Sequence, residues 1–288
     1  MTATVIDGKR IASEIHQEVS LAIKTYGLEP KLAVILVGKD PASQVYVKRK
    51  RKVCEEIGIC SELHEFPADV SQQKLEDFIG ALRCCTSTDG ILVQLPLPTS
   101  LDKDRILNAV PPEMDVDCFS AMNVGHLAQG KALLKPCTPA GILEILKYHQ
   151  IPTQGRRVTI INRSQVVGQP LALVLQQDPY NSTVTVCHEH TETLPFHTLY
   201  SDIVITAVGK YPKFQLPADW LPQGGTVIDV AMNRVDGKLF GDVADFEAAK
   251  ERVQFITPVP GGVGPLTVAM LMKNTLIAAK LKRNLIGR

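Results

Sequence analysis

The stretch VTIINRSQVVGQP, residues 158–170, reads as a strand that runs directly into a turn and then into a helix. The apolar residues 158–161 predict a buried strand, and the polar turn from Asn162 leads to a helix start near Gly168 and Pro170. Such a helix start directs backbone N–H groups toward a phosphate. The stretch lacks the G-x-G-x-x-G fingerprint, so by itself it is a weak signal for nucleotide binding.

Strand and helix patterns alternate along the rest of the chain. Apolar runs rich in β-branched residues predict further buried strands, at 32–37, 90–95, 183–186, 203–208 and 226–230. Helical spacing or helix-start residues predict helices at 11–24, 43–58, 72–84, 139–149, 170–177 and 266–281. This alternation is typical of an α/β protein.

The chain is long enough for two α/β domains. It has 288 residues, of which 45% are hydrophobic, and single domains usually hold ~100–200 residues. Two prolines within 136–141 favour a boundary there. We expect a first domain over 1–140 and a second, doubly wound Rossmann-type domain over 141–265. The C-terminal helix, within 266–288, is expected to pack back on the first domain.

Composition argues against several classes of partner. The 31 basic and 30 acidic residues give a net charge of +1, so no broad positive surface for nucleic acid is expected. No apolar run approaches the roughly 18 residues of a membrane span, and the N-terminal stretch MTATVIDGKR lacks a secretory apolar segment. Seven cysteines without a CxxC pair indicate reduced thiols rather than a disulfide framework or a zinc site. We expect a soluble, cytoplasmic protein with no bound metal and no membrane partner.

A second informative stretch is VYVKRKRKVCEEIG, residues 45–58, which carries five consecutive cations from Lys48 to Lys52. Asp40 and Pro41 are typical of a helix start and predict one helix over residues 42–58. The cationic run has three possible meanings: a nucleic-acid patch, a solvated helix face, or a setting for one lysine that does chemistry.

Helical geometry separates Lys50 from the other four cations. At about 100° per residue, one face of the helix carries an apolar stripe, whose members are Ser43, Tyr46, Val47, Lys50, Val53, Cys54 and Ile57. A buried amine carries a desolvation cost that suits proton transfer near neutrality. The alternative is a lysine whose stem covers apolar surface while its ammonium stays in water. The helix alone does not decide between these interpretations.

Two other segments supply polar side chains that favour a site. Gln94 lies near the carboxyl end of the predicted strand 90–95, where α/β folds place ligands. Asp115 and Asp117 alternate in a predicted loop, which is also compatible with an ordinary solvated turn.

Several motifs together resemble the bifunctional methylenetetrahydrofolate dehydrogenase/methenyltetrahydrofolate cyclohydrolase family. The resemblance is collinear over nearly the whole chain and rests on Val5-Ile6-Asp7-Gly8-Lys9, Tyr46-Val47-x-x-Lys50-x-Lys52, Gly90-Ile91-Leu92-Val93-Gln94-Leu95-Pro96-Leu97-Pro98, Asp115-Val116-Asp117, Lys135-Pro136-Cys137-Thr138-Pro139, Arg163-Ser164-x-x-Val167-Gly168-x-Pro170 and Pro258-Val259-Pro260-Gly261-Gly262-Val263-Gly264-Pro265-x-Thr267.

The resemblance implies two reactions on one folate. 5,10-Methylenetetrahydrofolate would lose a hydride to NADP⁺, and water would then open the methenyl product to 10-formyltetrahydrofolate. The first domain would be catalytic and would bind the folate, and the two α/β domains would flank a cleft. Lys50 would be the acid/base group, Tyr46 would stack on the folate, Gln94 would hold Lys50, and Asp117 would bond the pterin ring.

The resemblance also implies binding residues beyond these four catalytic candidates. Tyr46 and Asp117 would share substrate binding with Pro260, Gly261, Gly262 and Pro265. The expected cofactor-binding residues are Thr138, Asn162, Arg163, Ser164, Val167, Gly168, Glu189 and Ala231.

Three positions depart from the glycines usual in the family, namely Cys118, Asn162 and Ala231. Asparagine tolerates a positive φ, so the turn at Asn162 is expected to persist. The charge of Arg163 suits the 2′-phosphate of NADP, whereas Glu189, after the strand 183–186, suits the ribose hydroxyls of NAD. We expect NADP as the cofactor, with NAD as the alternative.

Two further hypotheses compete with the bifunctional enzyme. The changed glycines favour a family member that keeps mainly the cyclohydrolase, and the run Lys48–Lys52 favours a nucleic-acid binder whose affinity falls steeply with salt. The balanced net charge argues against the binder. The family resemblance further implies a homodimer that forms through the Rossmann domain.

Overall fold

The structure is a computed structural model, and it describes residues 2–286. The chain divides into two compact units, described separately below. The three-stranded unit comprises residues 14–137 and the chain from 268 onward. The six-stranded unit comprises the residues up to 13 together with 138–267. The boundaries between the units fall within the helices α1 (Gly8–Tyr26) and α10 (Val263–Lys282) and at the start of α6 (Cys137–Tyr148).

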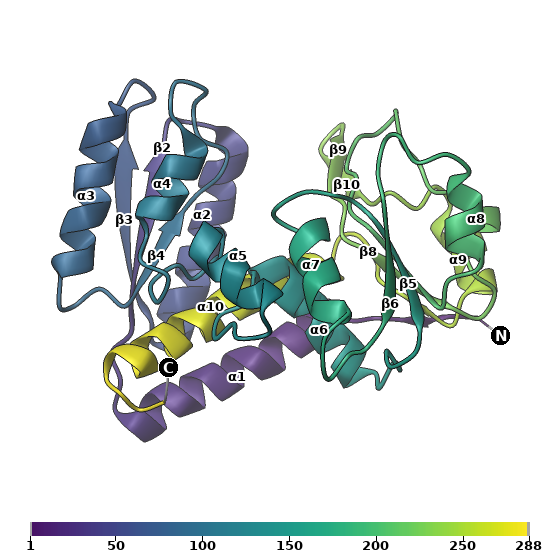
Figure 1. Cartoon of the computed structure of the whole chain (residues 1–288), viewed down its shortest axis with the longest axis horizontal. Coiled ribbons are helices and arrows are strands. Elements are labelled where there is room, and N and C mark those ends of the chain that lie inside the picture. The colour runs from purple at the N-terminus through teal and green to yellow at the C-terminus, as the bar shows by residue number, and fades with distance from the viewer. Residues whose placement is uncertain (1, 287–288) are drawn as a thin grey trace. The chain divides into compact units, whose positions relative to one another are not determined.

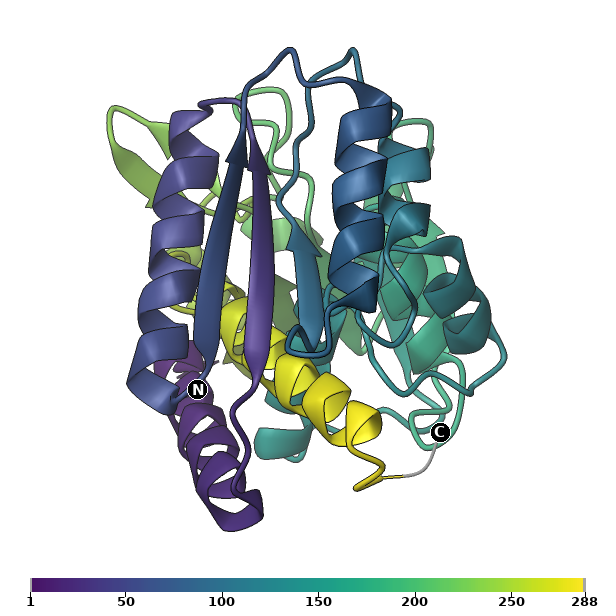
Figure 2. The same cartoon turned by 90° about the vertical axis from the view of Figure 1, so that its left-hand side faces the viewer.

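The three-stranded unit is built on a parallel sheet with the order β3-β2-β4. Its strands are β2 (Lys31–Val37), β3 (Cys60–Phe66) and β4 (Gly90–Val93), and Figure 2 shows them side by side. The connecting helices α2 (Pro41–Ile57) and α3 (Gln72–Cys84) lie on opposite sides of this sheet (Figure 1). The shorter helices α4 (Lys103–Ala109) and α5 (Ala121–Ala128) follow β4.

The central strand β2 is buried on both faces, as its continuous apolar sequence predicts. Ala33, Ile35 and Val37 pack in one core cluster with the α3 residues Leu75 and Ile79. Near the C-terminal end of α2, the sulfur atoms of Cys54 and Met272 lie 3.3 Å apart. This contact joins α2 to α10.

The six-stranded unit has a parallel sheet with the order β1-β11-β8-β7-β5-β6. Its strands are β1 (Thr4–Val5), β5 (Arg157–Ile161), β6 (Thr183–Cys187), β7 (Ile203–Thr206), β8 (Thr226–Asp229) and β11 (Phe255–Ile256). Helix α6 lies in this unit from its second residue onward, and α7 (Gly168–Leu175), α8 (Leu194–Leu199), a 3₁₀ turn at Ala218–Trp220 and α9 (Phe246–Arg252) follow it along the chain. A small hairpin, β9 (Asn233–Val235) and β10 (Lys238–Phe240), completes the unit.

The strand order changes direction at β5. The chain passes from β5 through α7 to β6 on one side, and then continues with β7 on the other side of β5. Ligands of doubly wound sheets bind at the carboxyl ends of the strands beside such a switch point. The predicted turn at Asn162 directly follows β5, so it lies at this point.

The α/β class, the parallel sheets and the Rossmann-like second unit are as the sequence predicts. All six predicted strands and all six predicted helices are present, with ends shifted by a few residues. The start of the chain differs from the expected boundaries, which put it in the first domain. Thr4 and Val5 instead form β1, which pairs with β11 at the edge of the six-stranded sheet.

The edge strand β3, the two-residue strands and the hairpin lack the sequence signals that predict the other strands. Within residues 2–286, no helix combines the length and the apolarity that a membrane crossing requires.

Candidate active site

Helix α2 presents Lys50 to the interior of the three-stranded unit. The helix begins where the Asp40 carboxylate accepts the Ser43 N–H at 2.8 Å, and Pro41 occupies its first turn. It ends at Gly58, whose left-handed φ of 89° closes the last turn. Lys50 is only 5% exposed. The other members of the predicted stripe are buried with it, except that Tyr46 and Val53 are half-buried. The snorkelling alternative, which requires a wet ammonium, does not describe the Lys50 side chain.

The ammonium of Lys50 contacts Gln94 and Tyr46 in this unit. Its Nζ donates a hydrogen bond to Oε1 of Gln94 at 3.2 Å. The amide of Gln94 is oriented by its own Nε2, which donates to the Leu95 carbonyl at 2.7 Å. The Nζ also lies 4.8 Å from the centroid of the Tyr46 ring, within cation–π range. Lys50 is therefore held by a neutral acceptor and an aromatic face.

Tyr46, Asp117 and Cys137 lie close enough to influence one another. Burial, followed by the charge of Asp117, raises the pKa of the Tyr46 phenol to about 12. Burial also raises the pKa of the Cys137 thiol well above its ordinary value, with a further contribution from Asp117. Tyr46 and Cys137 are therefore neutral near pH 7, and Asp117 supplies the acidic side chain of this cluster.

The segment that carries Asp117 is fixed by its buried neighbour Asp115. The Asp115 carboxylate accepts hydrogen bonds from the Ser120 N–H at 2.8 Å and from Asn123 Nδ2 at 3.0 Å. Burial raises the pKa of Asp115 despite these donors. A solvated turn, the alternative interpretation of this segment, is excluded for Asp115, which is 5% exposed.

Cys118 has a backbone φ of 60°, a left-handed conformation that explains why a glycine suits this position. Its side chain is 1% exposed, and its thiol donates to the Asp115 carbonyl at 3.4 Å. Burial raises the pKa of this thiol well above its ordinary value. Cys118 is therefore a packed side chain rather than a reactive thiol.

Two residues of this region received no role in the sequence analysis. Cys137 stands in a quoted motif, but only its tertiary position brings it near Tyr46 and Asp117. Asn274, on α10, donates from Nδ2 to the carbonyls of Val116 at 2.7 Å and Lys135 at 2.8 Å. Asn274 is a polar residue inside a long apolar helix pattern, and this alone predicts that its side chain hydrogen-bonds to buried groups.

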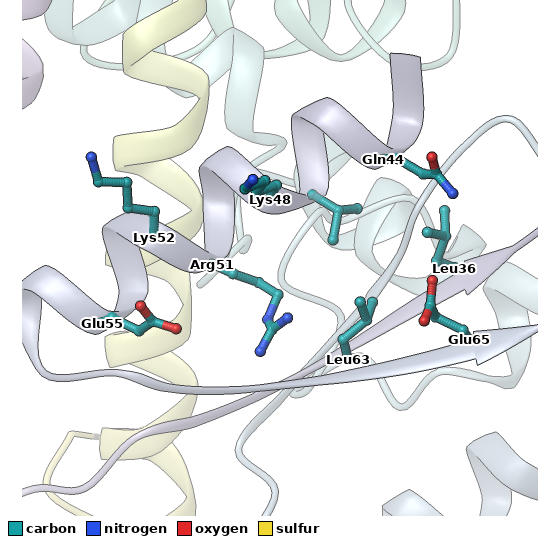
Figure 3. A pocket seen from close by; sticks show the side chains of 9 residues that line it. Leu36, Gln44, Lys48, Arg51, Lys52, Glu55, Leu63 and Glu65 are labelled. Atoms are coloured by element: carbon teal, nitrogen blue, oxygen red, sulfur yellow. The ribbon is translucent and has the colours of Figure 1, made fainter. Parts of the chain in front are cut away.

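The cations around Lys50 face a different surface. Lys48, Arg51 and Lys52 line a hollow of about 510 Å³ between α2 and β3, and Lys50 does not line it. Figure 3 shows Arg51 pointing from the helix toward the strand that carries Leu63. Lys48 and Lys52 are exposed, and Lys52 pairs with Glu56 at 3.8 Å. The cationic run is thus divided between one buried lysine and a largely solvated face.

In the six-stranded unit, the side chain of Asn162 organises the turn after β5. Its Oδ1 accepts hydrogen bonds from the Ser164 N–H at 2.8 Å, the Ser164 hydroxyl at 2.6 Å and the Gly168 N–H at 3.0 Å. Its Nδ2 donates to the Ala207 carbonyl, after β7, at 2.6 Å. Asn162 does not have a positive φ. The turn therefore persists through side-chain hydrogen bonds and not for the predicted conformational reason.

Gly168, the first residue of α7, has no room for a side chain. A Cβ atom at this position would lie 1.9 Å from the Asn162 carbonyl oxygen. The Ser164 hydroxyl accepts the Val167 N–H at 3.1 Å, which completes the turn. The structure therefore brings together Asn162, Ser164, Val167 and Gly168 of the predicted cofactor residues.

Arg163 and Glu189 form an ion pair between the ends of the neighbouring strands β5 and β6. The hydrogen bond from Arg163 lowers the pKa of the Glu189 carboxyl to about 2. Both side chains are about half exposed. Glu189 is thus a direct neighbour of Arg163, and the contact of either residue with a cofactor stays a prediction.

The remaining predicted cofactor residues have other partners. The Thr138 hydroxyl lies 3.0 Å from that of Thr267. Ala231 is buried, and its N–H donates to Asp229 at 3.1 Å. Pro260, Gly261, Gly262 and Pro265 belong to the six-stranded unit, whereas Lys50 belongs to the other unit. The role of these four residues in substrate binding stays a prediction.

The six-stranded unit has the features that a dinucleotide requires. The tight turn lies at the switch point of a parallel sheet, Gly168 permits close approach of the backbone, and an arginine stands at the end of β5. In the other unit, a buried lysine with an acceptor, a phenol and a carboxylate can hold a planar polar substrate and transfer protons.

Comparison with known proteins adds independent findings. The family model for the "Tetrahydrofolate dehydrogenase/cyclohydrolase, catalytic domain" matches residues 6–117. The model for the "Tetrahydrofolate dehydrogenase/cyclohydrolase, NAD(P)-binding domain" matches residues 136–283. A protein of Nitrosospira multiformis named "Bifunctional protein FolD" is 46% identical over 284 residues, which is 97% of both chains.

Two solved structures have the same fold over the full chain. The FolD methylenetetrahydrofolate dehydrogenase/cyclohydrolase of Campylobacter jejuni is 42% identical, with a TM-score of 0.92 over 97% of this chain and 99% of that one. The methylenetetrahydrofolate dehydrogenase-cyclohydrolase of Trypanosoma brucei, solved with NADP cofactor and an inhibitor, is 37% identical, with a TM-score of 0.91 over 100% of both chains.

Proposed function

The chain belongs to the tetrahydrofolate dehydrogenase/cyclohydrolase family, and from this premise we propose how its residues divide the work of two reactions. The protein is an enzyme of one-carbon metabolism. It oxidises 5,10-methylenetetrahydrofolate to the methenyl compound and hydrolyses that compound to 10-formyltetrahydrofolate. The enzyme is bifunctional, and neither the cyclohydrolase-only alternative nor the nucleic-acid binder receives support.

Lys50 is the acid/base group of the hydrolytic step in this proposal. The observation that supports this role is the buried Lys50 ammonium, bonded to the neutral oxygen of Gln94 rather than to a carboxylate. Hydrolysis of the methenyl carbon requires removal of a proton from water and delivery of a proton to the departing nitrogen. An amine that is not fixed in an ion pair can exchange its proton in both directions.

Tyr46, Gln94 and Asp117 position the reacting groups. The Tyr46 ring, with its neutral phenol, offers a flat face for the folate. Asp117 is proposed to accept hydrogen bonds from N–H groups of the pterin, because a carboxylate is an acceptor for such donors. Gln94 is a positioning residue that acts through Lys50.

When bound, the nicotinamide cofactor accepts the hydride, and the six-stranded unit holds it in place. The turn 162–168 and the start of α7 are proposed to bind the pyrophosphate. We propose NADP as the preferred cofactor, with its 2′-phosphate on Arg163. Because Glu189 already pairs with Arg163, the phosphate must compete with this carboxylate, and NAD is proposed as a second, weaker substrate.

A comparison of kcat/KM for NADP⁺ and NAD⁺ tests this cofactor assignment. Wild type is expected to favour NADP⁺ modestly, and Glu189→Gln is expected to raise that preference because the competing charge is removed. Glu192→Gln, which changes another acidic residue beyond the Arg163–Glu189 pair, serves as the charge-matched control. A strong wild-type preference for NAD⁺ would refute the assignment.

A spectrophotometric time course tests the bifunctional activity itself. Purified protein with 5,10-methylenetetrahydrofolate and NADP⁺ should produce reduced cofactor, and it should accelerate the loss of added methenyltetrahydrofolate. Hydrolysis without reduced cofactor would mean that the departures at Asn162, Cys118 and Ala231 have cost the dehydrogenase.

We further propose a homodimer formed through the six-stranded unit and a cytoplasmic location. All seven cysteines are free, which is typical of a reducing compartment. Light scattering of the purified protein would give the oligomeric state, and a monomer at working concentration would contradict the dimer.

A further inference from the structure

The three-stranded unit has a second pocket, of about 790 Å³, that the proposed reactions do not use. We call it the α5–α10 pocket, because side chains of α5 and the end of α10 form much of its wall. Small-molecule sites usually have volumes of roughly 300–1,000 Å³ and mostly apolar walls with a few polar groups. This pocket has the size and the mixed lining of such a site.

The pocket lies at the opposite end of the sheet from Lys50. Asp89, which lines the pocket, directly precedes β4, whereas Gln94, the partner of Lys50, directly follows it. Five residues of extended chain separate them by ~16 Å. None of Tyr46, Lys50, Gln94 and Asp117 lines the pocket. It is therefore distinct from the site of the reactions.

The walls offer an apolar surface that is open to solvent. Among the lining residues, Met114, Leu134 and Leu281 are buried, while Met122 and Leu133 are 57% and 47% exposed. Methionine side chains adapt to varied apolar shapes. Because both exposed side chains line the same pocket, they form an apolar surface that a ligand can cover.

The rim carries an excess of positive charge. Arg83, Lys131 and Lys282 line the pocket, against the carboxylates of Glu113 and Asp89. Asp89 is already neutralised by Arg283, whose Nη1 lies 2.7 Å from its Oδ1. The ammonium of Lys282 is held by the carbonyls of Thr88 at 2.6 Å and Cys85 at 3.0 Å, so its charge is fixed there without a carboxylate. An apolar molecule with one negative charge matches these walls.

The pocket also borders the segment that positions Asp117. Met114, in its wall, immediately precedes the segment 115–117. Asn123, another wall residue, donates to Asp115 at 3.0 Å and to the Pro112 carbonyl at 2.9 Å. A ligand in the pocket would thus contact the residues that hold the folate-facing loop.

We propose that the α5–α10 pocket binds a small amphipathic carboxylate, with an aromatic or aliphatic body on the methionines and its charge at the rim, and that binding changes the affinity for folate. The second part rests on the proposed function, because it requires a folate beside Asp117. Binding of the carboxylate in the pocket does not depend on the folate reactions.

The test uses 2-naphthoate as the probe and the uncharged 2-naphthamide as its control, each titrated into the full chain by calorimetry. Wild type should bind one naphthoate saturably and the amide less tightly. Arg83→Gln combined with Lys131→Gln should weaken naphthoate binding by about tenfold or more, because charge-assisted contacts are lost. Lys24→Gln with Lys39→Gln removes the same charge from exposed positions that do not line the pocket, and should change nothing.

Absence of saturable binding to wild type, or equal binding by the Arg83/Lys131 variant, would overturn the site. The KM for the folate should change at saturating naphthoate in wild type only, and an unchanged KM despite binding would overturn the coupling. If wild type binds naphthoate but catalyses neither folate reaction, even without naphthoate, the proposed function is refuted and the pocket is not.

Discussion

The Asn162 side chain accepts a hydrogen bond from the backbone N–H of Gly168, with 3.0 Å between Oδ1 and N. The same oxygen accepts two bonds from Ser164, so one side chain fixes both ends of the turn that begins α7. An asparagine in place of the usual family glycine therefore adds hydrogen bonds to the turn.

Replacing Asn162 by alanine should weaken cofactor binding. Two backbone N–H groups lose their acceptor, which is expected to lower the free energy of unfolding by about 1–3 kcal/mol. The KM for NADP⁺ should rise several-fold, whereas methenyl hydrolysis should keep its rate. Urea unfolding and steady-state kinetics check both effects. Unchanged cofactor kinetics would show that the turn does not depend on this side chain.

Gly168→Ala should be more damaging. The new Cβ would lie 1.9 Å from the Asn162 carbonyl oxygen, so the backbone of the turn must move. We expect a loss of at least about 2 kcal/mol of stability, in the range of overpacking substitutions. Gly80→Ala in α3 is the matched control, because its Cβ meets nothing within 4 Å. Equal stability of the two variants in urea would contradict the steric argument.

Asp229 should make stability depend on pH. Burial, with a contribution from Asp242, raises its pKa from 3.8 to about 7, although the N–H groups of Ala231, Asp242 and Val243 favour the charged form. The folded state therefore holds the proton more tightly than the unfolded state. The contribution of protonated Asp229 to the free energy of unfolding is complete below about pH 4 and is lost as the pH rises to about 7. Over that window the free energy of unfolding falls with a slope of up to about 1.4 kcal/mol per pH unit.

Unfolding of wild type and Asp229→Asn between pH 4 and pH 8 measures this contribution. The variant lacks the titrating group, so the difference in stability between the two proteins should vary with pH over that window and be constant above it. A difference that is constant throughout would show that Asp229 titrates normally.

Asn274→Ala should destabilise the three-stranded unit. The buried carbonyls of Val116 and Lys135 would each lose a donor, at a cost on the order of 2 kcal/mol or more. Because Val116 adjoins Asp117, the KM for the folate should also rise. Gln73→Ala, at an exposed position on α3, is the control for the loss of a side-chain amide. A variant as stable as wild type would mean that other donors replace Asn274.

The sequence predicts the elements whose signals are local. Continuous apolar runs predict β2 and β5, and the 100° periodicity of α2 identifies Lys50 as the buried cation. The edge strand β3 escapes this approach because its sequence CSELHEF has apolar residues only at every third position and carries charges, so it shows neither an apolar run nor strict alternation. The two-residue strand β1 has no local signal, since it depends on pairing with β11.

Contacts between distant residues explain the other omissions. The Arg163–Glu189 ion pair arises because β5 and β6 are neighbours in a parallel sheet, so the residues after each strand meet. The roles of Cys137 and Asn274 depend on packing around residues 115–117, which no periodicity reveals.

The most direct test of the account is the cyclohydrolase activity of Lys50→Gln, measured beside Lys48→Gln. Lys50 is buried against Gln94, whereas Lys48 is exposed on the same helix, so the pair separates proton transfer from a general loss of charge. We predict that Lys50→Gln folds but loses methenyl hydrolysis by about 10²–10⁴-fold, the usual range for a general acid or base, while Lys48→Gln keeps its rate. Undiminished hydrolysis by folded Lys50→Gln would contradict the central role of this lysine.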